Sequence, residues 1–448
     1  MDHAVVFGAG LAGLLSARVL ADGFTRVTVV ERDRLTGGPR RGVPQGRHAH
    51  ALLPRGRQII DELFPGVVAE LVAAGAVPYR PLEQARMVLG GQRMCRAETP
   101  ERGLALTRPF LEDHVRRRLL ALPNVTLLDG WDAVAPVVRD GAVTAARIAR
   151  APHDHRVLDA ALVVDAMGRA GRAATWLAEA GPGRPPVEEV EVNVGYGTCS
   201  LELPDDALGG DLLLLVGATP ANPRGMALFR VEGERWILSA GGMCGDHPPT
   251  DPAGFLDFVA TVVPAAMTDV MPALRAAPPP GRILPARFPK AVRRRYDRLR
   301  APLPGLIAAG DSTCSVDPLY GQGMSAAALQ AVALRDTLAR GRHDLERRYF
   351  RAARRATEPV WQLALTADLA FPGVPGAPPL LSRLAGRYVA RVQRAATRDP
   401  SCALAFARVV GLMNPPSALM RPAVMRAAAR HGSPTVRKDR NRRRLTDS

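Results

Sequence analysis

A glycine-rich turn between two short apolar segments constrains this chain more than any other feature. Residues 4–7 read as a buried strand, and the run Gly8-Ala9-Gly10-Leu11-Ala12-Gly13 follows directly. A helical stretch to about residue 21 and a second apolar strand at 27–30 then lead to Glu31. This order of strand, glycine turn, helix, strand and acid predicts a βαβ unit that binds a dinucleotide.

The individual positions of the motif have separate expected roles. Gly8 permits the tight turn, Gly10 lets the backbone approach a pyrophosphate, and Gly13 lets helix and strand pack closely. The helix N-terminus offers free N–H groups and a positive dipole end to the phosphates. Glu31 lies 18 residues after Gly13, where its carboxylate can accept hydrogen bonds from ribose hydroxyls.

The composition favours a large globular protein with a solvated basic surface. The chain has 448 residues, which predicts two or three structural units, and 47% of them are hydrophobic. The net charge is +17, but the arginines are scattered and aromatic residues, at 5%, are not interleaved with them. We therefore expect no nucleic-acid partner. The densest basic run, 437–444, lacks apolar periodicity and is predicted to be disordered.

The cysteines and apolar runs point to a cytoplasmic protein without a structural metal. The five cysteines are widely spread and form no CxxC pair, which argues against a disulfide framework or a zinc site. His48 and His50 lack a third metal ligand nearby in the sequence. We expect no signal peptide, because the first apolar run is a four-residue strand that enters a glycine turn. We expect no membrane span, because no uninterrupted apolar run reaches about 18 residues.

The order of the remaining elements predicts an α/β fold with a discontinuous nucleotide-binding domain. Parallel-type apolar strands are expected at the start of the chain, near 161–166 and near 306–309, and Val134–Ile148 reads as a hairpin. Residues 190–243 alternate polar and apolar, which predicts an inserted antiparallel sheet. Helices are expected from residue 345 onward.

A second motif lies late in the chain. The strand 306–309 ends in Gly310-Asp311, whose carboxylate can reach the hydroxyls of a ribityl chain. The turn Gly321-Gln322-Gly323 then opens a helix that begins with Met324. If a flavin lies there, the helix N–H groups point at its N1–C2=O edge, where the reduced ring carries negative charge.

In these motifs the chain resembles the FAD-dependent monooxygenases of the aromatic-hydroxylase-like superfamily. It is most similar to the actinobacterial branch that includes the polyether-pathway polyene epoxidases. The segments that carry this closer resemblance are Arg40–His50, Thr107-Arg108, Val163–Arg169, Tyr296–Leu299 and Tyr320–Ala328. One departure is the usual Asp-Gly of the middle motif, which stands here as Asp165-Ala166-Met167-Gly168.

The resemblance implies a set of FAD-binding residues and four regions. The expected cofactor ligands and neighbours are Gly8, Ala9, Gly10, Ala12, Gly13, Glu31, Arg32, Arg47, His48, Arg108, Val134, Asp165, Gly310, Asp311, Pro318, Gly321, Gly323 and Met324. Asp165 either lies near the cofactor or closes the corner after its strand. The expected regions are a discontinuous Rossmann-like FAD-binding domain (1–75, 101–185 and 286–344), a substrate-binding sheet domain (76–100 and 186–285), a helical region (345–430) and a basic tail (431–448).

The resemblance also implies a reaction. A reduced flavin converts O₂ to a C4a-hydroperoxide, which transfers one oxygen atom to an apolar natural-product intermediate, with epoxidation of an alkene as the expected outcome. No protein nucleophile is predicted. Aromatic hydroxylation, reduction of an isolated double bond and a non-catalytic flavoprotein are the alternatives. The chain has no second GxGxxG domain, so we expect NAD(P)H to act transiently or a separate flavin reductase to supply electrons.

Overall fold

The strand that leads into the glycine-rich turn lies at the centre of a five-stranded parallel sheet. The computed structural model describes residues 2–38, 40, 44–151, 154–279, 281–376 and 380–432. The sheet order is β18 (Leu306–Ala308), β12 (Leu162–Asp165), β1 (His3–Phe7), β2 (Arg26–Glu31) and β8 (Val125–Asp129). Val5 is in register with Thr28 on one side and Val163 on the other. Three stretches far apart in the sequence thus build one sheet, which confirms the predicted discontinuous fold.

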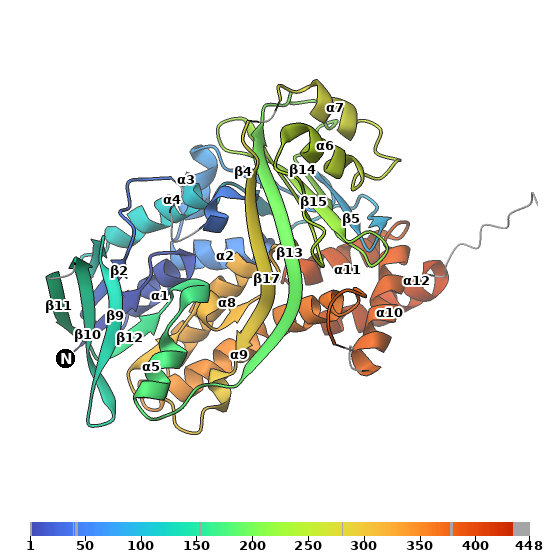
Figure 1. Cartoon of the computed structure of the whole chain (residues 1–448). Helices are drawn as coiled ribbons and strands as arrows, with labels where there is room; N and C mark the ends of the chain where they lie inside the picture. Colours follow the sequence, from blue (N-terminus) through green and yellow to red (C-terminus); the bar gives the residue numbers. More distant parts are fainter. Residues whose placement is uncertain are drawn as a thin grey trace, which may run out of the picture.

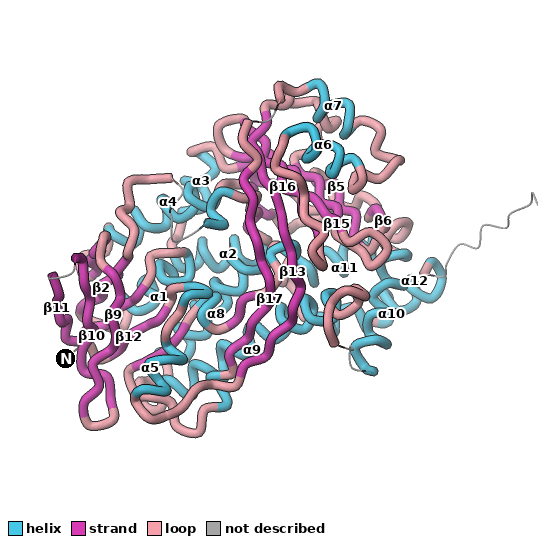
Figure 2. The backbone as a smooth tube through the Cα atoms, viewed as in Figure 1, coloured by secondary structure: helices cyan, strands magenta, loops and turns pink. Residues whose placement is uncertain are grey.

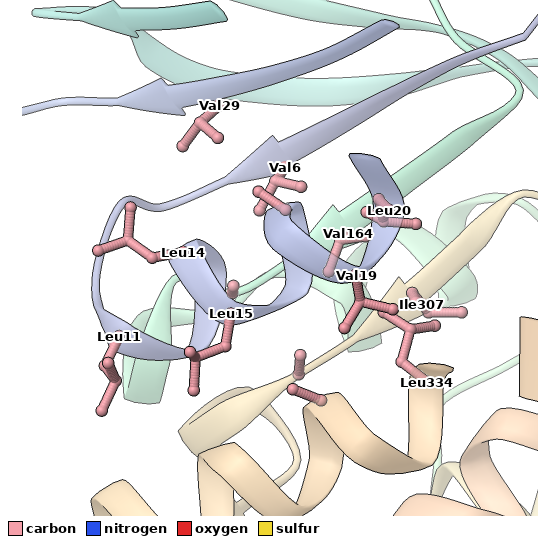
Figure 3. Close-up of a cluster of buried hydrophobic side chains, with 14 of the residues drawn as sticks. Val6, Leu11, Leu14, Leu15, Val19, Leu20, Val29, Val164, Ile307 and Leu334 are labelled. Atoms are coloured by element: carbon pink, nitrogen blue, oxygen red, sulfur yellow. The ribbon is translucent and has the colours of Figure 1, made fainter. Parts of the chain in front are cut away.

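Helix α1 (Leu11–Ala21) lies between this sheet and helix α8 (Gly323–Leu338). Figure 3 shows its side chains Leu11, Leu14, Leu15, Val19 and Leu20 among apolar residues of the strands and of α8. All five are at most 3% exposed. A helix covered on two sides needs apolar residues on more than one stripe, which explains why α1 has few polar positions.

The second large sheet has eight strands and is mostly antiparallel. Its order is β19 (Cys314–Ser315), β17 (Leu284–Arg294), β13 (Val187–Leu201), β16 (Arg235–Gly242), β15 (Arg224–Val231), β14 (Leu213–Val216), β5 (Ala85–Leu89) and β6 (Gln92–Arg93). Only the β14–β5 pair is parallel. The long strands β13 and β17 run side by side along the front of the molecule (Figure 1). The domain boundary predicted at residue 286 therefore lies inside β17.

The described residues form two further sheets of three strands each, and Figure 2 labels the strands of the first. One contains β9 (Asp132–Arg139), β10 (Ala142–Ala151) and β11 (Asp154–Asp159), and it includes the predicted hairpin at 134–148. The other contains β3 (Ala51–Leu52), β7 (Gly103–Ala105) and β4 (Val77–Tyr79).

The remaining helices cover the sheets or form a C-terminal cluster. Those before residue 300 are α2 (Pro54–Leu63), α3 (Val67–Ala73), α4 (Arg108–Leu120), α5 (Ala173–Glu179), α6 (Pro252–Ala260) and α7 (Val270–Ala276). Those after it are α9 (Leu345–Asp368), α10 (Leu380–Ala395), α11 (Pro400–Val410) and α12 (Pro422–His431). The predicted tail lies, from residue 433 on, outside the described residues. No helix in the described ranges combines the length and apolar character that crossing a bilayer requires.

Candidate active site

A cavity of about 830 Å³ opens where the carboxyl ends of the parallel strands meet the eight-stranded sheet. Gly8 and Gly10 line it directly after β1, and Asp311 lines it shortly after β18. On the other side Leu213 and Phe229 line it from β14 and β15. In open α/β sheets, ligands bind in the crevice outside the carboxyl ends of the strands, which is where this cavity lies.

The glycine turn has the geometry that the motif predicts. Gly8 has a φ of +100°, and a Cβ there would lie 2.6 Å from the carbonyl oxygen of Ala166. A Cβ at Gly13 would lie 1.8 Å from the carbonyl oxygen of Gly8, so helix and turn meet backbone to backbone. The space at Gly10 is open by contrast, because the nearest side-chain atoms to a Cβ there lie 3.8 Å away. The turn is tightly packed underneath and open towards the cavity.

A buried arginine joins two carboxylates beside this turn. Arg40 donates from Nη1 to Glu31 Oε2 at 2.8 Å and from Nη2 to Glu112 Oε2 at 2.5 Å. The side chains of Arg40, Glu31 and Glu112 are 7%, 10% and 4% exposed. Glu31 also accepts a hydrogen bond from the backbone N–H of Ala9 at 2.9 Å. The acid predicted to bind ribose is thus held rigidly at the turn.

Glu112 places a negative charge at the N-terminus of α1. The backbone N–H of Leu11 donates to its Oε1 at 3.0 Å, and Arg108 Nε donates to the same oxygen at 2.9 Å. Burial alone would raise the pKa of Glu112, but Arg108 and Arg40 outweigh it and hold that pKa below the ordinary value. Anions are favoured at this end of a helix because N–H groups and the dipole both point at them.

Asp311 is a half-buried carboxylate in the cavity wall. Within the described residues it accepts no hydrogen bond and forms no ion pair at contact distance. Burial raises its pKa, and the charges of Arg108 and Arg169 oppose that effect. The preceding Gly310 has a φ of +65° and donates its N–H to Gln330 Oε1 at 2.8 Å, which fixes the turn. Asp311 is therefore positioned to accept hydrogen bonds from a ligand.

The structure brings most of the predicted cofactor residues to this one cavity. Those that line it are Gly8, Gly10, Ala12, Glu31, Arg32, His48, Arg108, Gly310, Asp311, Pro318, Gly321, Gly323 and Met324. Those that lie nearby without lining it are Ala9, Gly13, Arg47, Val134 and Asp165. Their roles towards a cofactor stay predictions.

Asp165 uses its carboxylate for hydrogen bonds within the protein. Its carboxylate accepts hydrogen bonds from the backbone N–H of Met167 at 3.1 Å, the backbone N–H of Ala173 at 2.6 Å and the hydroxyl of Ser312 at 3.2 Å. It is 0% exposed. These contacts close the corner after β12 and favour the structural one of its two predicted roles.

Several site residues were not singled out by the sequence. Arg40 begins one segment that carried the resemblance and Glu112 lies four residues after another, Thr107-Arg108, yet nothing near either residue indicates that they pair with each other. Tyr196 also lines the cavity, as does His50, which was considered above only as a metal ligand. A charged residue inside an otherwise apolar helix face, as Glu112 is, was the available signal.

One part of the cavity wall, opposite the glycine turn, is apolar. Its side chains come from β5, β14, β15 and α11 and include Met87, Leu213, Leu215, Met226, Phe229 and Val410. Such a wall binds hydrocarbon surface and excludes water. In the part of the chain that the structure describes, no group of three or more potential metal ligands is found.

One known protein is similar to this chain over nearly its full length. Protein Rv3254 of Mycobacterium tuberculosis (strain ATCC 25618 / H37Rv) is 34% identical over 442 residues, which cover 94% of this chain and 92% of that protein. A search of protein-family models found no match.

Two solved structures share the fold at low sequence identity. PqsL from Pseudomonas aeruginosa, described as "a probable FAD-dependent monooxygenase", superposes with a TM-score of 0.61 at 18% identity, covering 82% of this chain and 96% of PqsL. The p-nitrophenol 4-monooxygenase PnpA from Pseudomonas putida DLL-E4 gives 0.62 at 17% identity, covering 92% and 97%. The chain thus belongs to the family of Protein Rv3254, and its fold is the one that these two monooxygenases share.

Proposed function

We propose that this protein is an FAD-dependent monooxygenase that inserts one oxygen atom from O₂ into an apolar small molecule. The observation that carries the proposal is a single cavity with two unlike sides. The open glycine turn and the free carboxylate of Asp311 lie on one side, and an apolar wall of sheet residues lies on the other.

The residues present fit FAD. The turn at Gly10 leaves room for a pyrophosphate, and Arg108 supplies positive charge beside it. Glu31 suits the adenosine ribose, and Asp311, which has no partner within the described residues, suits ribityl hydroxyls. Gly323 and Met324 begin α8 and line the cavity, so the N–H groups of the first helical turn suit a negatively charged edge of the flavin. When bound, reduced FAD supplies the activation of O₂ and the oxygen transfer.

The protein's own contribution is to bind the substrate and to exclude water. The apolar wall of Leu213, Leu215 and Phe229 would hold a hydrocarbon frame against the cofactor side. An alkene-bearing natural-product intermediate, converted to an epoxide, is the substrate class that the resemblance favours. Epoxidation needs no protein nucleophile.

Hydroxylation of a phenol is a second candidate. PnpA, which shares the fold, is named for p-nitrophenol. This reaction benefits from a group that takes the phenol proton. His48 and His50 line the cavity, and burial lowers the pKa of each to about 4, so both are uncharged near neutral pH and can accept a hydrogen bond.

The test is incubation of the purified protein with FAD, NAD(P)H, a flavin reductase and candidate substrates under ¹⁸O₂. A gain of one ¹⁸O atom in the product supports a monooxygenase, and the position of the label separates an epoxide from a phenol. A gain of two hydrogens without oxygen would instead identify a reductase of double bonds. If the protein neither holds FAD nor regains it on reconstitution, the proposal fails.

A further inference from the structure

Three side chains on the sheet side of the cavity form one hydrogen-bonded chain. His48 Nδ1 lies 2.8 Å from Thr198 Oγ1 on β13, and Thr198 Oγ1 lies 2.5 Å from Ser239 Oγ on β16. The backbone N–H of Ala49 donates to Ser239 Oγ at 3.1 Å. His48 and Ser239 both line the cavity, whereas Thr198 is 1% exposed. Both ends of this hydrogen-bonded series, His48 and Ser239, therefore lie at the cavity, and its middle member, Thr198, is buried.

The donor and acceptor roles along this series of hydrogen bonds can reverse. Hydroxyl groups donate and accept, and a neutral imidazole carries its proton on either nitrogen. In one arrangement Ser239 donates to Thr198, Thr198 donates to Nδ1 of His48, and the ring proton is on Nε2. In the other, Nδ1 donates to Thr198 and Thr198 donates to Ser239, which leaves the Nε2 lone pair free. No hydrogen bond to Nε2 is formed within the described residues, so a ligand can use it.

The surroundings keep His48 uncharged. Burial, with a smaller effect from Arg47, lowers the pKa of His48 to about 4. The ring of Tyr196 packs edge-on against it at 4.7 Å, and burial raises the pKa of Tyr196 to about 12, so that neighbour stays protonated. The hydroxyls of Thr198 and Ser239 are neutral. Because an imidazolium is disfavoured here, a proton that arrives at Nε2 is most readily matched by loss of the Nδ1 proton.

His50 differs from His48 in one decisive respect. Its Nδ1 lies 2.8 Å from the carbonyl oxygen of His48, which can only accept, so the ring proton is fixed on Nδ1. The charged groups that act on His50 are Arg108 and Glu112, and within the described residues it forms no hydrogen bond to a side-chain hydroxyl. His50 can accept a hydrogen bond from a ligand but has no path by which to pass a proton onward.

We propose that His48 binds a hydroxyl group of the substrate through Nε2 and that Thr198 and Ser239 relay its proton away. The substrate class is then an apolar molecule with an ionisable hydroxyl, a phenol or an enol. The inference rests on the second candidate of the proposed function, hydroxylation of a phenol, and names the group that prepares the substrate for it. The partners of His48 belong to the eight-stranded sheet, which forms the apolar wall of the cavity.

The proposed step balances without any redox change. The substrate O–H bond breaks as the Nε2–H bond forms, and the Nδ1 proton moves to Thr198. Thr198 gives its own proton to Ser239, and Ser239 releases one to water in the cavity. The substrate oxygen keeps its electron pair and becomes an anion, which makes the attached ring or double bond more electron-rich.

The experiment follows proton loss without turnover. Oxidised FAD-loaded protein is saturated with 4-nitrophenol, whose phenolate is coloured, and the pH is raised rapidly in a stopped-flow instrument. His48→Asn keeps a polar atom near the Nδ1 position and removes Nε2, and Thr198→Val removes the hydroxyl with little change in shape. Both should slow phenolate formation by about 10²-fold.

Two further variants separate the relay from structural damage. Thr198→Ser restores the hydroxyl and should recover most of the rate lost in Thr198→Val. His114→Asn is the matched histidine control, because His114 bonds to the carbonyl oxygen of Phe110 on α4 and does not line the cavity. It should leave the rate at the wild-type value.

The outcomes distinguish this inference from the proposed function. Equal rates in wild type and His48→Asn would overturn the relay, and so would a failure of FAD-loaded wild type to bind 4-nitrophenol. Either result leaves the proposed monooxygenase standing if FAD is bound and ¹⁸O is incorporated. Loss of FAD binding in the wild type would instead refute the proposed function.

Discussion

The hydroxyl of Tyr320, in the loop that lines the cavity, donates a 2.6 Å hydrogen bond to Oδ1 of Asp368 at the end of α9. Burial raises the pKa of a second carboxylate, Asp317, and the charge of the nearby Asp368 raises it further. Both are 0% exposed, and each has an Oδ2 atom without a partner within the described residues. A buried carboxyl pair of this kind is stable only when at least one member is protonated.

This pair predicts that stability falls as pH rises. Burial raises the pKa of Asp368 to about 7 from an ordinary value of 3.8, so the folded state retains a proton that the unfolded state has lost. The free energy of unfolding should therefore decrease as the pH rises from 3.8 to about 7. Asp368→Asn cannot ionise, and above neutral pH it should be more stable than wild type by roughly 1–3 kcal/mol.

Urea unfolding over a pH series measures this effect. Asp257→Asn is the control, because Asp257 is 73% exposed and forms only a surface pair with Arg275. Its pH profile should run parallel to that of wild type. If Asp368→Asn also runs parallel, the carboxyl pair does not hold a proton.

Gly13→Ala should damage the nucleotide-binding turn. The new Cβ would lie 1.8 Å from the carbonyl oxygen of Gly8, and backbone on both sides cannot yield easily. We expect a loss of roughly 2–3 kcal/mol in the free energy of unfolding, together with loss of bound FAD. Gly23→Ala is the matched control, since a Cβ there meets no atom within 4 Å. Unfolding curves and flavin absorbance report both effects, and equal behaviour of the two variants would contradict the packing argument.

Asp311→Ala should weaken FAD binding with little effect on folding. The carboxylate lines the cavity and accepts no hydrogen bond within the described residues, so its removal leaves no unpaired protein group behind. Loss of hydrogen bonds to ribityl hydroxyls should raise the Kd for FAD about tenfold or more. Flavin fluorescence titration measures this, with Asp257→Ala as control. An unchanged Kd would show that Asp311 does not face the cofactor.

Arg40→Met should destabilise the protein, because it leaves Glu31 and Glu112 buried without their shared cation. Breaking a buried charge network in this way costs roughly 3–5 kcal/mol. Adding Glu112→Gln removes one of the stranded charges and should restore part of the loss. Thermal unfolding of the single and double variants gives the coupling free energy between Arg40 and Glu112. Simple additivity of the two substitutions would rule out the network.

The parts of the fold that could be predicted from the sequence are those fixed by local geometry. The turn at Gly8–Gly13 needs glycines where backbone meets backbone, and the strand before Gly310 is a short apolar run. Each leaves a signal within a few residues. The same holds for the hairpin around Asp140, which has a positive φ.

Partners that are distant in the sequence could not be predicted in this way. The Arg40–Glu112 pair spans 72 residues, and the His48–Thr198 hydrogen bond spans 150. The sequence does not indicate the partner of either residue, because an arginine or a histidine in a loop can equally well be exposed to solvent. Strand β17 was divided by a predicted boundary for a similar reason, since its register with β13 depends on pairing across about a hundred residues.

Because the parallel sheet is built from distant segments, it can assemble only stepwise while the chain is being synthesised. The strand that contains Val5 leaves the ribosome early, yet its neighbour β12 and the outer strand β18 are made only after residues 162 and 306. Gly10 and Asp311, which line the proposed cofactor side of the cavity, are likewise about 300 residues apart in the chain. A nascent chain therefore exposes an unpaired edge of the sheet during most of translation. If FAD binds as proposed, it can stabilise the protein only once about two thirds of the chain has been made.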